Sequence, residues 1–131
     1  MPGWGTGSFD NEDAQEWLKR LATVRVDQIT EVLARAASNP TYLEAHDSSI
    51  AIAAAEVIAT VNGLPAPQVP PAIRGWMDQN PIDSAPELTA LALEAVRRVA
   101  SNSELKDLWL EADGLREWQA AVRELEQRLA K

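Results

Sequence analysis

The sequence has no cysteine and only one histidine, and its twelve basic residues are outnumbered by twenty acidic ones. Without cysteine there is no disulfide framework, no thiolate zinc site and no cysteine nucleophile. The single histidine and the lack of a Gly-x-Ser-x-Gly motif leave no recognisable catalytic triad. The net charge of −8 argues against binding to the phosphates of nucleic acids or to anionic membrane surfaces.

The length of 131 residues suits one domain. Hydrophobic residues make up 46% of the chain, which is too many for a disordered acidic segment. The first residues show no basic stretch followed by an apolar one, so we expect no secretory signal. The longest apolar stretch, from Ile50 to Val61, is too short to span a bilayer of about 30 Å. We therefore expect a cytoplasmic protein.

Apolar residues recur at helical spacing along the chain, and no segment shows the alternation of a strand. We predict one all-α domain over residues 1–131, with six or seven helices in an irregular arrangement around a central apolar helix. A glycine-rich loop (residues 1–9) precedes the helices, and a proline-rich connector (residues 64–71) lies between two of them. On the last helix, Arg123 and Arg128 are predicted to face solvent. The expected helices start at Asp10 or Asn11, after Asp27, near Ser48, at Pro71, after Ser84, after Ser103 and at Leu115.

The segment from about Ser48 to Asn62 is apolar on nearly all sides, which is typical of a buried helix, and it carries Glu56. A buried carboxylate requires compensation. One interpretation is structural, with Glu56 bonded to an arginine, a tryptophan N–H or a backbone amide. The other makes Glu56 a candidate catalytic residue or ligand.

Three further residues with metal-binding side chains lie in the segment that leads into this helix: Glu44, His46 and Asp47. Their spacing matches no zinc motif, although Mg²⁺ often takes only one or two carboxylates. Glu44, Asp47 and Glu56 are therefore weak metal candidates, and we expect no cofactor, with a divalent cation as the alternative. In the structural interpretation Asp47 caps the helix, Glu44 lies near its positive end and His46 is a solvated loop residue.

The five tryptophans are many for a small helical chain, and Trp4, Trp76 and Trp109 lie near the ends of predicted elements. Tryptophans in such positions can close a pocket or face a partner. More often they fill the core, with the indole N–H hydrogen-bonded. Gly3–Gly7 resembles a phosphate loop, but no strand precedes it and no lysine follows. We expect this loop to let Trp4 and Phe9 fold back onto the core.

Several short segments resemble a bacterial family, domain of unknown function 4259. They are Trp4–Phe9, Asp13-Ala14 with Trp17, Tyr42–Glu44, Ala54–Glu56, and Ser103–Leu105 with Leu108-Trp109. The likeness spans nearly the whole chain, and Pro2 departs from the glycine usual in the family. The resemblance implies a small bacterial domain without an assigned activity and transfers no catalytic residues. It directs attention to Trp4, Trp17, Glu44, Glu56, Glu104 and Trp109.

Two functions fit these observations. The first is a non-enzymatic acidic module that binds a basic protein partner, for example an immunity-like inhibitor of a basic toxin. The second is a small hydrolase or ligand-binding protein in which Glu56 acts as general base or metal ligand, helped by Glu44 and His46. A homodimer formed through exposed tryptophans is a third arrangement. The candidate binding residues are Trp4, Glu44, Glu56 and Trp109.

Overall fold

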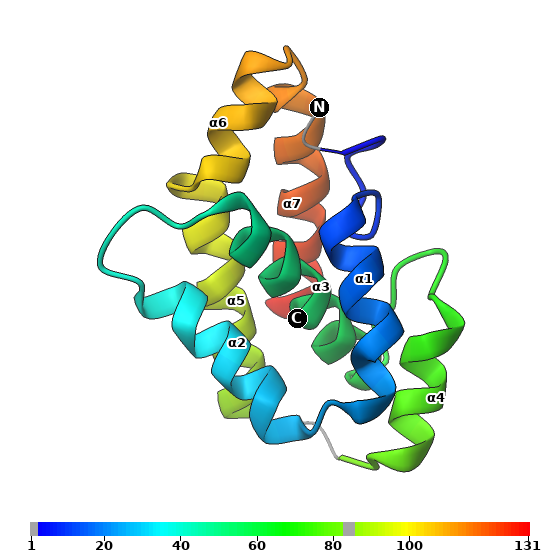
Figure 1. Ribbon diagram of the computed structural model, residues 1–131. Coiled ribbons are helices and arrows are strands. Elements are labelled where there is room, and N and C mark those ends of the chain that lie inside the picture. Colours follow the sequence, from blue (N-terminus) through cyan, green and yellow to red (C-terminus); the bar gives the residue numbers. More distant parts are fainter. Residues whose placement is uncertain (1–2, 83–85) are drawn as a thin grey trace.

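A computed structural model describes residues 3–82 and 86–131, and within these ranges it contains α-helices and one 3-10 helix but no strand (Figure 1). The prediction of an all-α fold with six or seven helices is confirmed. The elements are α1 (Glu12–Arg20), the 3-10 helix η1 (Leu21–Thr23), α2 (Val26–Ser38), α3 (Ala45–Val61), α4 (Pro71–Gln79), α5 (Pro86–Ser101), α6 (Glu104–Glu111) and α7 (Leu115–Leu129).

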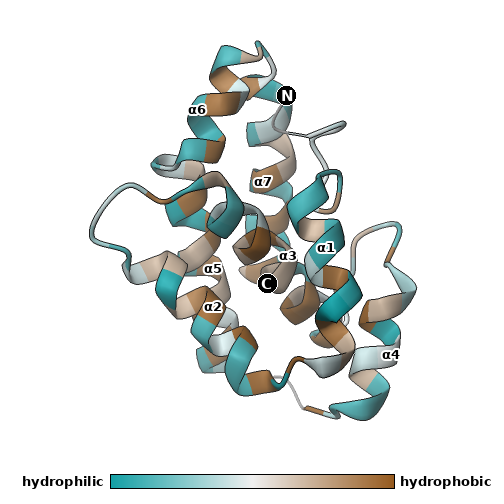
Figure 2. Ribbon diagram, viewed as in Figure 1, coloured by the Kyte–Doolittle hydropathy of each residue, from teal (hydrophilic) through white to brown (hydrophobic). Residues whose placement is uncertain are grey.

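The central helix is α3, and every residue from Ser48 to Thr60 is buried. It packs against α1, α2, α5, α6 and α7, and apolar residues gather towards it (Figures 1 and 2). The helix begins at Ala45, three residues before the predicted start near Ser48. It ends before Gly63, whose positive φ of 79° suits a residue without a Cβ. The predicted central apolar helix is therefore confirmed.

Local signals set most of the helix starts that the sequence predicts. Asn11 caps α1 by accepting a hydrogen bond from the backbone N–H of Ala14, and Ser103 caps α6 in the same way through Lys106. Helix α2 starts at Val26, so the predicted start after Asp27 is too late. The predicted cap Ser84 lies outside the described residues.

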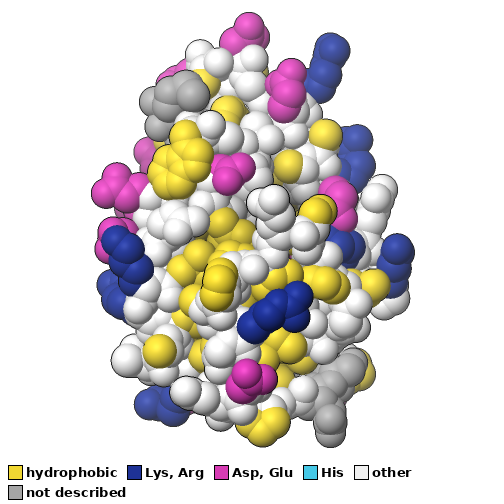
Figure 3. Space-filling view, turned by 90° about the vertical axis from the view of Figure 1, so that its right-hand side faces the viewer, with side chains coloured by type: hydrophobic (Ala, Val, Ile, Leu, Met, Phe, Trp, Pro, Cys, Tyr) yellow, Lys and Arg dark blue, Asp and Glu magenta, His cyan; other side chains and the backbone are white. Residues whose placement is uncertain are grey.

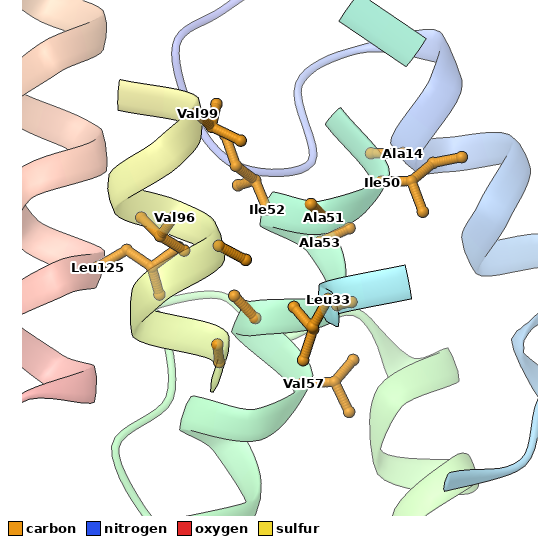
Figure 4. Packing of buried hydrophobic residues seen from close by; sticks show 14 of the residues in the cluster. Ala14, Leu33, Ile50, Ala51, Ile52, Ala53, Val57, Val96, Val99 and Leu125 are labelled. Carbon is orange, nitrogen blue, oxygen red and sulfur yellow. The ribbon is translucent and has the colours of Figure 1, made fainter. Parts of the chain in front are cut away.

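The core around α3 is completed by α5 and α7. Val96 of α5 and Leu125 of α7 point towards each other, and Leu33 of α2 approaches Val57 of α3 (Figure 4). All four side chains are fully buried. Because α7 lies along this core, residues at the edge of its apolar face come close to α3. No helix among the described residues has the length and apolar character needed to cross a membrane.

Candidate functional site

A groove of about 620 Å³ lies where the N-terminal loop, α1, α3 and the proline-rich connector meet. We name it the Glu56 groove because Glu56 of α3 lies in its wall. Figure 3 views the molecule from the side that carries α4 and the connector; apolar side chains gather in the middle of this face and most charged ones lie around them. The described lining residues include no Lys or Arg; they are residues 7–10, Gln15, Glu56 and residues 66–71.

Glu56 is held by three hydrogen bonds. Arg128 of α7 donates from Nη1 to Oε1 at 2.8 Å and from Nη2 to Oε2 at 3.0 Å, which is a bidentate ion pair. The hydroxyl of Ser8 donates to Oε2 at 2.6 Å. A carboxylate offers about four acceptor sites, so three of them are taken. The side chains of Glu56 and Arg128 are only 4% and 11% exposed.

Arg128 joins three parts of the chain. Besides Glu56, it donates from Nε to Glu124 at 2.6 Å and from Nη1 to the carbonyl of Leu64, at the start of the connector, at 3.2 Å. Burial opposes the charge of the guanidinium, but the bonds to Glu56 and Glu124 outweigh it and raise the pKa of Arg128 above its usual value. The prediction that Arg128 faces solvent is wrong, whereas Arg123 is exposed as predicted.

Glu56 lies far from the other two residues suggested as a shared metal site. Glu44 precedes α3 and Glu56 is twelve residues further along, which is about 18 Å of helix axis. Glu44 is exposed and Asp47 lies in the first turn of α3. The described residues contain no group of three or more metal-binding side chains. Glu44 and Glu56 therefore do not hold one cation together.

The start of α3 is capped from another helix. Glu104 of α6 accepts a hydrogen bond from the backbone N–H of Ala45 at 2.8 Å, and its own backbone N–H donates to the carbonyl of Leu43. The predicted role of Asp47 as the cap is wrong, because α3 begins before it. A carboxylate at this end also suits the helix dipole.

His46 is part of α3 and not a loop residue, although its side chain is exposed as expected. Its Nδ1 lies 2.9 Å from Oδ1 of Asp13 in α1. Each side chain is about half exposed, so the pair faces water.

The N-terminal loop winds around Asp10. The backbone N–H of Trp4 donates to the carbonyl of Asp10, and the backbone N–H of Gly7 donates to its carboxylate. A Cβ on Gly5 or Gly7 would lie 2.7 or 2.6 Å from Oδ2 of Asp10, which explains these glycines. Trp4 is 64% exposed, so the expectation that it fills the core is wrong. Phe9 does pack against the core.

The other two tryptophans near element ends are buried. Trp76 of α4 donates its indole N–H to the carbonyl of Val24 at 2.7 Å, which is the core role with a bonded indole N–H. Trp109 is 6% exposed and lies beside a cavity of about 20 Å³, so its side chain does not face solvent. That volume holds no more than a water molecule.

A contact between the loop before α3 and helix α6 was not apparent from the sequence. The hydroxyl of Tyr42, in the loop between α2 and α3, donates a short hydrogen bond to Asp107 of α6. This bond, together with desolvation and the negative charges of Asp107, Glu104 and Glu111, raises the pKa of Tyr42 to about 12. Tyr42 is the only tyrosine in the chain.

Tyrosinate absorbance therefore tests this contact directly. In the folded protein we expect the midpoint near pH 12, against about 10 for a free tyrosine. Because the folded state holds the proton more tightly, the contribution to stability is complete below pH 10 and is lost as the pH rises towards 12. Asp107→Asn should move the midpoint back towards 10. A wild-type midpoint at 10 would contradict the contact.

Comparison with known proteins identifies a family to which most of the chain is similar. The model of a domain of unknown function, DUF4259, matches residues 3–121, which includes Glu56 and the Tyr42 contact but not Arg128. No curated protein and no solved structure matches the chain.

Proposed function

We propose a function from the residues of this chain itself, because the chain belongs to the DUF4259 family, whose description assigns no activity. The proposal is a non-enzymatic acidic module that binds a basic protein partner. The non-enzymatic part rests on one observation: the buried carboxylate that chemistry would need, Glu56, is engaged by Arg128 and Ser8. The choice of a basic partner is supported by the net charge of −8.

A general base needs a free acceptor site aimed at the substrate proton. In Glu56 three of about four acceptor sites are taken, and a fixed cation lies directly against both oxygens. Arg128 in turn contacts Glu124 and the connector, so the ion pair ties α3, α7 and the connector together. The arrangement therefore favours a structural role for Glu56.

The excess of acidic over basic residues comes from carboxylates other than Glu56, which is neutralised by Arg128. Seven carboxylates of the described residues form ion pairs, and most of the others have no cationic partner among them, including Glu44, Asp107 and Glu111. A net charge of −8 attracts positively charged proteins and repels acidic ones. A small inhibitor of a basic toxin in the bacterial cytoplasm would have these properties.

The test is a titration of candidate basic proteins by calorimetry at low and high salt. We expect the affinity to fall steeply between about 50 and 500 mM salt, because charges separated by more than the Debye length are screened. Glu56→Gln, which changes a buried group, should leave the affinity within about twofold when the variant is folded. Binding that is insensitive to salt would overturn the proposal.

A second candidate is a ligand-binding protein or metal-assisted hydrolase, and the specific observation in its favour is the groove that reaches Glu56. Melting with and without Mg²⁺, Mn²⁺ and Ca²⁺ tests it, since a ligand that binds only the folded state raises the melting temperature. An increase that Glu56→Gln abolishes would favour this candidate. If none of the three ions raises the melting temperature, the metal-assisted hydrolase is excluded.

A further inference from the structure

The outer face of α6 lies at one end of the molecule (Figure 1). Asp107, Leu110 and Glu111 are three and four residues apart, so they lie on the same side of the helix, and all three are exposed. Tyr42 joins them through its hydrogen bond to Asp107. We name these four residues the α6 face.

Exposed apolar side chains distinguish this face. Leu110 is 60% exposed and Tyr42 is 50% exposed, and among the described residues only Trp4 joins them as a large, exposed hydrophobic side chain. Isolated exposed residues are ordinary, but here one lies on the helix and the other is bonded to it, and tyrosine is among the residues enriched at binding hot spots. The loop that carries Tyr42 is fixed, because Arg98 donates to the carbonyls of Asn39 and Thr41.

The charges around this apolar pair identify the occupant. Asp107 and Glu111 are exposed carboxylates, and neither forms an ion pair within the described chain. The cation on the same helix, Lys106, donates to the carbonyl of Ser101 at 3.2 Å. A second copy of the chain would bring another net charge of −8, so charge complementarity selects a basic partner.

We propose that the α6 face is the docking surface for a basic segment of the partner protein, an inference that rests on the proposed function. The alkyl stems of arginine or lysine side chains lie on Leu110 and Tyr42, and their charged ends reach Asp107 and Glu111. Long basic side chains suit such a surface because they combine an apolar stem with a charged end. The ring of Tyr42 also attracts cations.

The experiment uses an oligo-arginine peptide as the probe and compares two double variants of the full chain. Asp107→Asn with Glu111→Gln removes two charges from the α6 face. Asp78→Asn with Glu87→Gln removes two charges from α4 and from the start of α5, so both variants have the same net charge. Circular dichroism establishes that each is folded, and fluorescence anisotropy of labelled peptide gives the affinity.

We expect the α6-face variant to bind the peptide about fivefold to tenfold more weakly than the wild type, and the matched variant to bind within about twofold. Leu110→Ser should also weaken binding, because it removes apolar contact without changing charge. Equal losses of affinity in the two double variants would contradict docking on the α6 face, but not the proposal of an acidic binding module. Wild-type binding that is absent or insensitive to salt would overturn both.

Discussion

Replacing Arg128 with methionine is expected to lower the free energy of unfolding by about 3–5 kcal/mol, the range found when one partner of a buried ion pair is removed. The carboxylate of Glu56 would keep only the hydroxyl of Ser8 as a partner, although its side chain is 4% exposed. Methionine fills much of the space of the arginine stem, so the loss reports chiefly on the unpaired charge. Denaturant unfolding measures it.

Arg123 provides the matched control, because it lies on the same helix but is exposed. Arg123→Met should change the free energy of unfolding by no more than about 0.5 kcal/mol. Similar small losses in both variants would show that the ion pair does not hold α7 against α3.

A double variant separates the charge from the packing. Glu56→Leu together with Arg128→Met removes both charges and leaves apolar side chains of comparable size. Buried ion pairs are often replaced in this way at little cost, so the double variant should be more stable than Arg128→Met alone. If the double variant is less stable than Arg128→Met, the loss of unfolding free energy comes from packing and not from the unpaired charge.

The burial of Glu56 could be predicted from its sequence neighbours, because Ile52, Ala53 and Ala59 lie around it on a helix. Its partner could not be predicted. Arg128 has Glu124 four residues before it, a spacing typical of a solvent-exposed pair on an amphipathic helix. The contact between residues 56 and 128 depends on how α7 lies along α3, and helical periodicity contains no information on that packing.

The N-terminal loop is a second place where the sequence predicts the local structure but not the position of a side chain. Its glycines predict a tight loop, and the structure confirms tight packing of Gly5 and Gly7 against Asp10. The direction of Trp4 depends on the path of the backbone around Asp10, which composition does not specify. Hydrophobicity alone predicts a buried indole, whereas the side chain is 64% exposed.

The second large effect is expected for Trp76→Ala, which should lower the free energy of unfolding by about 3–5 kcal/mol. Trp76 is 2% exposed, and α4 packs on α1 and η1. The substitution leaves a cavity and removes the donor to the carbonyl of Val24. Trp76→Phe keeps an aromatic ring and should lose only about 1–2 kcal/mol, chiefly through the missing hydrogen bond.

Trp4→Ala is the control for Trp76→Ala, since it removes the same side chain from an exposed position. It should change stability by less than about 0.5 kcal/mol. The connector that lines the Glu56 groove runs directly into α4, so the packing of Trp76 also positions that wall of the groove. If Trp4→Ala were as destabilising as Trp76→Ala, the N-terminal indole would be part of the core, and the exposed conformation of the loop would be wrong.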